Sequence, residues 1–352
     1  MKERRNRKGS SILPAVGILL ALAAVVWIIL GTTAGRRMTA KAAAGYIHKN
    51  IQYVPGAVSS NGTQRTPERT PASGSEQEQE QEKEQSGERQ FFTFLLLGEE
   101  AIRSAPGKGR TDLMMLATLN LPEQSIQLVS LLRDTLVKIP GFQDNKLNAV
   151  YAAGGVELLY EVLEESYGVR PDAYFLVGFE EFERMIDRLG GVTVMLTAQE
   201  AEYLNTTNYI ADESSRTVVA GTQNLNGSQA LGYCRIRKVP TCHGTQYDYG
   251  RTERQRMVLN SLFHQYISAG IYEWIPLLRE MLGIVQTDIS QELLEDVLYA
   301  VYDNKITAMN MLQLPEAGTF EEADRVENVT SVLIPQWELL RERLRQFLFQ
   351  PE

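Results

Sequence analysis

The sequence FFTFLLLG, residues 91–98, is a continuous apolar run that ends in glycine. Runs of this length, bounded by turn residues, are typical of strands buried on both faces of a sheet. Two similar runs follow at residues 113–120 (LMMLATLN) and 126–132 (IQLVSLL), separated by a turn around Pro122. The stretch 91–132 therefore predicts three strands of one buried sheet, around which the rest of the domain is organised.

Strand and helix patterns alternate after this stretch. The sequence predicts strands at 173–179 and 192–196, and helices at 156–167, 179–189, 251–268, 272–282, 291–302 and 336–349. Such alternation indicates an α/β domain with a central, mostly buried β-sheet flanked by helices on both faces. After residue 250 the predicted pattern is mainly helical. We place the domain at residues 91–352.

The N-terminus has the composition of a membrane anchor. Residues 1–10 carry five basic residues and one acid, and residues 11–31 are apolar and uncharged. About 20 such residues span a bilayer, whereas the apolar part of a cleavable signal is roughly 7–15 long. We therefore expect a retained signal anchor with the basic residues 1–10 in the cytoplasm and the domain outside the cell. Cleavage within the Ala-rich residues 39–44 is the alternative.

Residues 32–90 connect this anchor to the domain. Residues 38–54 predict a short juxtamembrane helix, and residues 55–90 are rich in Ser, Gly, Gln, Glu and Pro. Such a composition buries too little apolar surface to fold alone, which predicts a disordered linker. With a reach of ~5–6 Å × √n, it would hold the domain roughly 30 Å or more from the bilayer.

The composition excludes two classes of site. A net charge of −9 argues against nucleic acid as the partner, because nucleic-acid binding needs a broad basic surface. Three histidines and two cysteines form no cluster with zinc spacing along the chain. We therefore expect any metal site to use oxygen ligands.

An arginine-rich segment stands out in this acidic chain. Residues 228–255 contain Arg235, Arg237, Arg251 and Arg254. Guanidinium groups stay charged and match phosphate oxygens bidentately, so the segment predicts a phosphate or pyrophosphate site. Residues two apart on a helix point about 200° apart, so the first two arginines can share a ligand only if the helix ends there. The nearby Pro240 favours that ending, and a solvated helix face is the alternative.

Charged residues also gather where the predicted strands end, the usual place for ligands in open α/β sheets. They comprise Glu99 and Glu100 after the first strand, Arg110 and Asp112 at the start of the second, and Arg133 and Asp134 after the third. A single Arg–Asp pair is usually a surface ion pair of little energetic value. Their recurrence at successive strand ends indicates a site.

Seven blocks of the sequence together resemble the LytR-CpsA-Psr (LCP) family of bacterial cell-envelope proteins. In order they are LLLG followed by an acid, GRTDLMML, VSLLRDTLVKIP, KLNAVYAAGG, IDRLGGVTV, LNGSQALGYCRIR and YGRTERQ. Any one block is weak evidence, but their order and spacing match the family from about Phe91 to the C-terminus.

The resemblance implies a phosphotransferase with an LCP-like α/β/α fold. Such enzymes move a glycopolymer from a polyprenyl pyrophosphate carrier to peptidoglycan, forming a phosphodiester and releasing polyprenyl phosphate. Carried over by position, the pyrophosphate-binding residues would be Arg110, Arg133, Arg235, Arg237 and Arg251. Glu100 and Asp112 would hold Mg²⁺ (or Mn²⁺), and Asp134, Asp248 and Gln255 would act with Arg133 in catalysis by supporting the arginines or the acceptor. Oxygen ligands beside phosphate suit these cations.

The chain departs from the family pattern at several positions. Glu100 stands where the family usually has aspartate, and Leu132 replaces a proline before Arg133. The loop at residues 238–247 is longer than usual and contains Cys242. Outside the cell a disulfide from Cys242 to Cys234 would contribute on the order of 2–3 kcal/mol, and we favour it over two unrelated thiols. His243 is interpreted as an ordinary loop residue.

Two functions fit the sequence. The first is the transferase, which the matched arginines favour. The second is a non-catalytic protein that binds polyprenyl phosphates or regulates cell-wall assembly, because Glu100 could weaken the metal site. The sequence does not identify the polymer, whether teichoic acid, capsule or another glycan, or the residues that would receive the lipid.

Overall fold

The computed structural model describes residues 33–55, 89–99, 111–268 and 283–350. The chain divides into two compact units. The smaller one contains the described residues up to Lys49 together with residues 290–305, and the larger one contains the rest. The predicted membrane anchor, most of the predicted linker and the helix predicted at 272–282 lie outside the described residues.

The smaller unit consists of α2 (Thr33–Asn50) and α10 (Gln291–Asp303). Arg36 forms an ion pair with Asp303 at 2.8 Å, and the Arg37 guanidinium lies 4.8 Å from the centre of the Tyr299 ring. Within the described residues, no helix has both the length and the apolar character needed to cross a membrane. Both helices were predicted, with α2 starting and ending a few residues earlier than expected.

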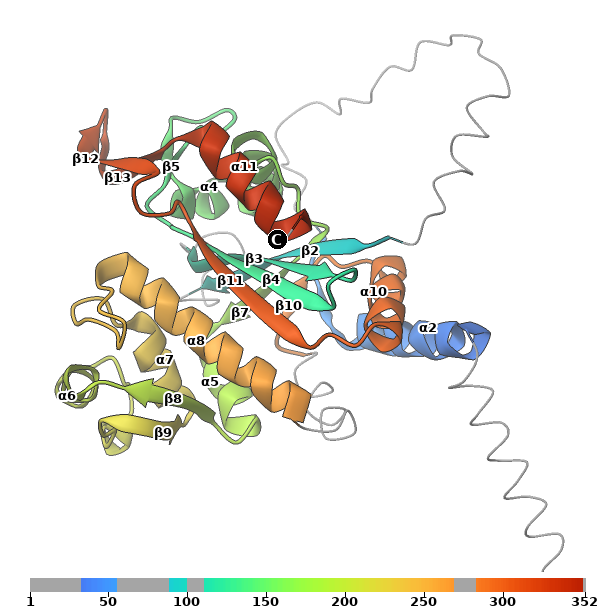
Figure 1. Ribbon diagram of the computed structural model, residues 1–352, viewed down its shortest axis with the longest axis horizontal. Helices are drawn as coiled ribbons and strands as arrows, with labels where there is room; N and C mark the ends of the chain where they lie inside the picture. The colour runs from blue at the N-terminus through green and yellow to red at the C-terminus, as the bar shows by residue number, and fades with distance from the viewer. Residues whose placement is uncertain (1–32, 56–88, 100–110, 269–282, 351–352) are drawn as a thin grey trace, which may run out of the picture. The chain divides into compact units, whose positions relative to one another are not determined.

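The larger unit is built on a mixed seven-stranded sheet (Figure 1). Its strand order is β1-β10-β7-β2-β3-β4-β11. The strands are β1 (Gln52–Tyr53), β2 (Phe91–Glu99), β3 (Thr111–Asn120), β4 (Ser125–Leu131), β7 (Ala173–Gly178), β10 (Gln286–Thr287) and β11 (Ala308–Leu314). Strands β2, β3, β4 and β7 confirm the predicted ones. Strand β1 comes from the predicted juxtamembrane segment and pairs with β10 at the sheet edge.

The strand directions bring several strand ends together at one edge of the sheet. Strands β7, β2, β4 and β11 run parallel, while β3 runs antiparallel between β2 and β4. The C-terminal ends of β2, β4 and β7 therefore meet the N-terminal end of β3. At this edge Gly98 pairs with Leu113 and Glu99 with Thr111, so Asp112 is the extra residue of a β-bulge. Bulges of this kind are common beside active sites, where they redirect a side chain.

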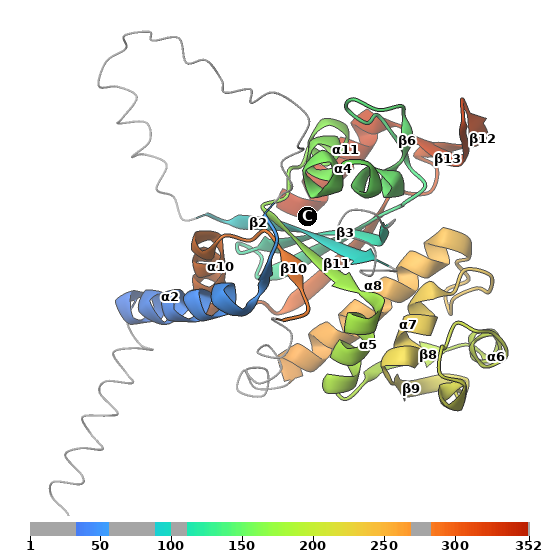
Figure 2. The same ribbon diagram turned by 180° about the vertical axis from the view of Figure 1, so that it is seen from behind.

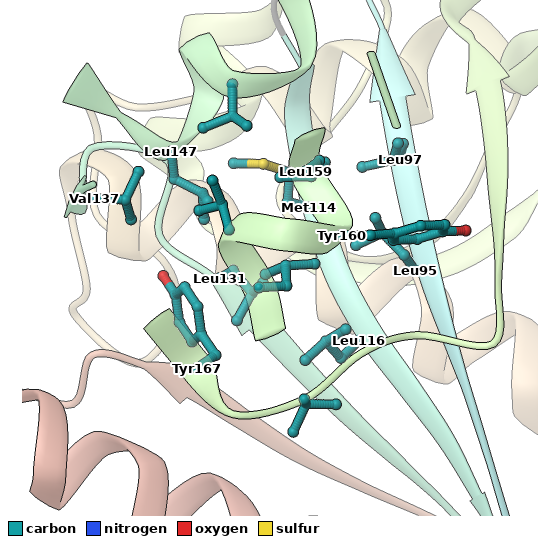
Figure 3. Close-up of a cluster of buried hydrophobic side chains, with 14 of the residues drawn as sticks. Leu95, Leu97, Met114, Leu116, Leu131, Val137, Leu147, Leu159, Tyr160 and Tyr167 are labelled. Atoms are coloured by element: carbon teal, nitrogen blue, oxygen red, sulfur yellow. The ribbon is translucent and has the colours of Figure 1, made fainter. Parts of the chain in front are cut away.

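One face of the sheet packs against α4 (Leu147–Val162) and α11 (Trp337–Phe349) (Figures 1 and 2). Leu95 and Leu97 of β2 point into this core together with Leu159 of α4, as Figure 3 shows. Helix α4 continues into a short π-helix (Leu163–Tyr167), which matches the helix predicted at 156–167.

The opposite face carries α5 (Phe179–Arg188), α7 (Gly227–Arg235) and α8 (Tyr247–Ser268) (Figure 2). Beside them a two-stranded sheet of β8 (Val192–Leu196) and β9 (Gly221–Leu225), with α6 (Ala198–Thr206) and a 3₁₀ turn (Glu213–Ser215), surrounds a second apolar core. The strand predicted at 192–196 is therefore real but lies outside the central sheet. Helices cover both faces of that sheet, as the sequence predicts.

The C-terminal part contains the predicted helices α8, α10 and α11 but also strands that the sequence did not predict. Strand β11 extends the central sheet beside β4, and β12 (Phe320–Val326) pairs with β13 (Val329–Pro335) as a hairpin. The remaining small sheet pairs β5 (Leu136–Val137) with β6 (Asn145–Lys146). Within the described residues, β11 pairs with β4 alone, and several of its side chains are exposed. It therefore lacks the continuous apolar run of the inner strands.

The contact between α7 and α5 leaves no room for a side chain at Gly227. A Cβ atom there would lie 2.1 Å from the backbone oxygen of Glu183, and the Gly227 amide donates a 2.7 Å hydrogen bond to Asp187. Gly227→Ala should therefore lower the free energy of unfolding by about 1–3 kcal/mol or more. The added methyl group can fit only if the backbone of α5 or α7 moves, which disturbs the packing of both helices. Thermal denaturation followed by circular dichroism measures this. Gly283→Ala, which meets no atom within 4 Å, should be near neutral, and equal effects of the two changes would contradict the close packing.

Candidate functional site

The end of α7 directs two arginines into one region. Asn226 begins the helix with a capping box, in which its side chain accepts a 2.9 Å hydrogen bond from the Gln229 amide. The helix ends at Arg235, because Ile236 has an extended backbone with ψ of 133°. Arg237 thus lies beyond the helix rather than on its far side. This confirms the condition under which Arg235 and Arg237 can share a ligand.

Helix α8 supplies the next set of polar side chains. Asp248 lies in its first turn, and Arg251 and Gln255 follow three and seven residues later, which places all three on one face. The Asp248 carboxylate is also favoured by the positive end of the helix dipole.

A single carboxylate holds three guanidinium groups together. Asp248 Oδ1 lies 3.0 Å from Arg251 Nη2, 3.4 Å from Arg133 Nε and 3.5 Å from Arg237 Nε. The Arg251 side chain is only 5% exposed, whereas that of Arg237 is 41% exposed. The Asp248 carboxylate thus draws three guanidinium groups together in one place, an arrangement that suits an anionic ligand.

A second ion pair lies beside this cluster. Asp134 Oδ1 is 2.8 Å from Lys146 Nζ, and Asp134 Oδ2 is 3.8 Å from Arg133 Nε. The predicted role of Asp134 as a support for an arginine agrees with this geometry, although Lys146 is its nearer partner. Sequence reasoning missed Lys146, whose position at the end of β6 opposite β5 depends on strand pairing.

The arginines line a cavity of about 300 Å³ between the sheet and the helices α5, α7 and α8. Its polar lining includes Arg133, Arg235, Arg237, Arg251 and Gln255. Its apolar lining includes Leu96, Leu113, Phe175, Val177, Phe179, Phe182, Met185, Leu231 and Leu259. Leu231 precedes Arg235 by one helical turn and Leu259 follows Gln255 by one turn, so apolar walls continue away from the polar groups.

The cavity explains a pattern of burial in the central strands. Along β2 and β7, residues that face α4 are buried, whereas Leu96, Phe175 and Val177 are half-buried because they line the cavity. The continuous apolar runs were interpreted as strands covered on both faces. One of those faces borders a space rather than a fully packed core.

Two polar groups at the cavity are held in their orientation by neighbouring residues. The Arg235 guanidinium lies over the rings of Phe179 and Tyr209, 5.2 Å and 5.6 Å from their centres, which fixes its direction. Gln255 donates from Nε2 to the Cys234 carbonyl at 3.5 Å, while its buried Oε1 has no hydrogen-bond partner within the described part of the chain. Buried acceptors are normally satisfied, so Oε1 suits a hydroxyl donor from a ligand.

Arg254, which is not among the predicted pyrophosphate-binding residues, does not line the cavity. Its side chain is fully buried, and its Nε donates to Glu200 Oε1 at 2.7 Å. Its Nη1 and Nη2 donate to the carbonyls of Ile236 and Val239 at 3.1 Å and 2.8 Å. Arg254 thus holds in place the segment that carries Arg237.

The predicted disulfide is absent, because Cys234 and Cys242 are both free. Cys234 is buried in α7 beside the second core, where burial raises the pKa of its thiol to about 12. Cys242 lies on the loop, with its Sγ 3.6 Å from His243 Nδ1. The short spacing of the two cysteines along the chain allowed a disulfide to be predicted. In the structure, Cys234 points into the second core, whereas Cys242 lies on the loop after α7.

The predicted metal ligands are not fully described. Glu100 and Arg110 lie outside the described residues, and of Asp112 only the backbone in β3 is described. Sequence reasoning also missed the aromatic and apolar lining of the cavity. Phe182 and Met185 are three residues apart on α5, which predicts that they share one face of the helix. This spacing does not indicate whether that face borders a cavity.

The fold and the site define an α/β protein with a largely apolar cavity lined by arginines, which suits an amphiphilic anion. Residues 57–344 match the model of the LytR_cpsA_psr family, and the chain belongs to this family. Three similar proteins illustrate its range.

Regulatory protein MsrR of Staphylococcus aureus (strain COL) is 30% identical over 198 residues, which cover 56% of each chain. The matched region thus spans little more than half the length of this relative. Polyisoprenyl-teichoic acid--peptidoglycan teichoic acid transferase TagU of Halalkalibacterium halodurans is 28% identical over 252 residues, covering 71% of this chain and 76% of TagU. The crystal structure of protein gbs0355 from Streptococcus agalactiae is 25% identical with a TM-score of 0.60, covering 74% of this chain and 88% of that one.

The buried pair of Arg254 and Glu200 makes a testable contribution to stability. Glu200→Gln should lower the free energy of unfolding by about 3–5 kcal/mol, because it leaves the Arg254 charge buried without its counter-ion. Chemical denaturation of the purified protein measures the change. Arg184→Gln removes an exposed partner of Glu181 and should cost less than about 1 kcal/mol. A Glu200→Gln effect as small as the control would show that the pair does not hold this segment.

Proposed function

We propose that this protein transfers a glycopolymer from a polyprenyl pyrophosphate carrier to peptidoglycan. The observation that carries the proposal is the combination of four arginines and an extended apolar wall in one cavity. A polyprenyl pyrophosphate has the same two parts, a doubly charged diphosphate group and a hydrocarbon chain. The relative TagU is named for a transfer of this kind.

The proposed ligand would be oriented by the two parts of the cavity. Arg133, Arg235, Arg237 and Arg251 would bind the diphosphate, because guanidinium groups match phosphate oxygens bidentately. The polyprenyl chain would lie against the apolar side chains of the sheet and α5, which include Leu96, Phe175 and Phe182. Contact with these side chains would favour the lipid-linked form over a free pyrophosphate.

The reaction would exchange one phosphate ester bond for another. An acceptor hydroxyl of peptidoglycan would form a bond to the glycan-side phosphorus, the bridging P–O bond would break, and polyprenyl phosphate would leave while the hydroxyl proton passes to solvent. In such phosphoryl transfers the protein mainly positions the reacting groups and neutralises their charge. Asp248 would keep Arg133, Arg237 and Arg251 converged, and Gln255 Oε1 would accept a hydrogen bond from the acceptor.

A divalent cation completes the proposal. Glu100 and Asp112 would hold Mg²⁺ or Mn²⁺, which would neutralise part of the charge on the diphosphate. The backbone supports this assignment, because Asp112 is the bulge residue opposite the last residues of β2, after which Glu100 follows directly. Carboxylate oxygens are also the donors that these hard cations prefer.

The proposed location is the outer face of a bacterial cell membrane. The basic residues 1–10 and the uncharged apolar residues 11–31 support a single signal anchor with the domain outside the cell. There the domain would meet both its lipid-linked donor and peptidoglycan.

A regulatory protein that binds polyprenyl phosphates without turnover is the second candidate. It is favoured by the name of the relative MsrR and by Glu100, which stands where the resemblance leads us to expect aspartate. Turnover separates the two functions, because only the transferase releases polyprenyl phosphate from a pyrophosphate donor.

Removal of a cavity arginine should greatly slow transfer without unfolding the protein. Arg235→Ala or Arg237→Ala should lower turnover of a polyprenyl pyrophosphate-linked glycan by about 10²–10³-fold, the effect typical of losing one charge-stabilising donor. Release of polyprenyl phosphate by full-length protein in detergent is the measurement. Arg170→Ala, which changes an exposed arginine paired with Glu157 and Glu164, serves as the control. A folded cavity variant that keeps most of its activity would refute the site assignment.

The proposed cation makes transfer dependent on Mg²⁺ or Mn²⁺. Chelation and Asp112→Asn should each abolish turnover, whereas Glu100→Asp should retain or increase it because a carboxylate remains at this position. Turnover with and without added Mg²⁺ is compared for all variants. The exposed Asp144→Asn makes the same chemical change on the loop before β6, outside the residues that line the cavity, and should have no effect. Transfer that persists without a divalent cation would show that the arginines alone carry the charge.

A further inference from the structure

The loop between Arg237 and α8 contains a tight turn with Cys242 and His243 at its two central positions. The Gly244 amide donates to the Thr241 carbonyl at 2.9 Å, which closes the turn, and Gly244 has a φ of 85° that suits glycine. A further hydrogen bond of 2.8 Å joins the Thr241 amide to the Thr245 carbonyl. The backbone thus holds the thiol and the imidazole side by side.

Helix α8 brings a carboxylate to the same place. His243 Nδ1 lies 2.5 Å from Glu253 Oε1 and 3.6 Å from Cys242 Sγ. The three side chains offer ligand atoms that all lie within 4.8 Å of one another. Spacing along the chain did not reveal this cluster, because Glu253 follows the Cys-His pair by ten residues and meets it only through the loop.

The distances are close to those around a zinc ion. Bond lengths of about 2.3 Å to sulfur and about 2.0–2.1 Å to nitrogen or oxygen place tetrahedral ligand atoms roughly 3.3–3.6 Å apart. Cys242 Sγ lies 3.6 Å from His243 Nδ1 and 3.9 Å from His243 Nε2, so the sulfur is at a suitable distance and a rotation of the exposed imidazole would direct Nδ1 to an ion beside it. The shorter distance from His243 to Glu253 is that of a hydrogen bond, which a bound ion would replace.

Hydroxyl groups of two threonines fix the position of the Glu253 carboxylate. Thr245 Oγ1 donates a hydrogen bond to Glu253 Oε2, and Thr241 Oγ1 lies 2.7 Å from Thr245 Oγ1. Partners of this kind orient metal ligands and tune their affinity. The Glu253 side chain is 14% exposed and that of His243 is 69% exposed, so the cluster is held on one side and open to solvent on the other.

The nearby charges do not oppose a cation. Two guanidinium groups are nearby: Arg254, whose charge is balanced by Glu200 at 2.7 Å, and Arg256, which interacts electrostatically with Glu253. Glu253 supplies the negative charge beside the thiol when the imidazole is neutral. A simple ion pair between His243 and Glu253 accounts for two of the three side chains and leaves the adjacent thiol unexplained.

We propose that Cys242 Sγ, His243 Nδ1 and Glu253 Oε1 form a binding site for a Zn²⁺-type transition-metal ion, with water as the fourth ligand. Thiolate and imidazole ligands favour zinc over Mg²⁺ or Ca²⁺, which prefer oxygen. On binding, the thiol loses its proton to solvent and a metal–sulfur bond forms. The ion would fasten the turn to α8. This inference does not depend on the proposed transferase function.

Cobalt substitution tests the site directly. The full-length protein, reduced and stripped of metal, is titrated with Co²⁺, which should bind with a near-ultraviolet absorption band from thiolate-to-cobalt charge transfer. Zn²⁺ added afterwards should remove the band. The band separates this site from the proposed Mg²⁺ site, because Co²⁺ bound by carboxylates alone produces no thiolate band.

Variants identify the ligands. Cys242→Ala and the exposed change His243→Asn should lose the band, while Thr245→Val should keep it with ~10–100-fold weaker binding, as expected when a supporting hydrogen bond is removed. Cys234→Ala removes the other thiol and should keep the band. Circular dichroism verifies that each variant is folded. A native protein without the band, a band that persists in Cys242→Ala, or a band lost in folded Cys234→Ala would overturn the proposal.

Discussion

The segment between α7 and α8 depends on the buried ion pair of Arg254 with Glu200. Both side chains are fully buried, and Arg254 also donates to the carbonyls of Ile236 and Val239. Glu200 in turn accepts from the Thr197 amide at 2.7 Å in the capping box of α6. A buried charge needs its counter-ion and hydrogen bonds, so this pair can persist only while α6, α8 and the chain after α7 keep one arrangement.

The position of the arginines around Asp248 depends on that arrangement. Arg237 follows Ile236 directly, and Asp248 lies on the same helix as Arg254. Asp248 then joins Arg237 and Arg251 from this side of the cavity to Arg133 from the end of β4. Mutually repelling guanidinium groups are thus held together by one shared carboxylate. Because these contacts are already made, a bound diphosphate would not have to reorganise the site before its charge is neutralised.

The central sheet serves two different environments. Leu95 and Leu97 fill the core beneath α4, whereas Leu96 faces the cavity on the other side of the same strand. The alternation of side chains along a strand makes this division possible without any change of residue type. The segment between α7 and α8 also faces two environments. Arg237 lines the cavity, whereas the turn at Cys242 and His243 lies at the solvent-exposed surface.

The sequence by itself determined the central strands, most of the helices and the residues that form the arginine cluster. Their signals are local: apolar runs such as residues 91–98, helical periodicity, and the end of α7 before Pro240. Only the tertiary structure decided which charges work together. Arg251 and Arg254 are three residues apart on α8, yet one lines the cavity and the other is buried against Glu200. The separation of Cys234 from Cys242, the meeting of Cys242 with Glu253 and the placement of β11 beside β4 also depend on contacts between distant segments. Such contacts are set by packing in three dimensions, which a one-dimensional pattern of apolar and charged residues does not encode.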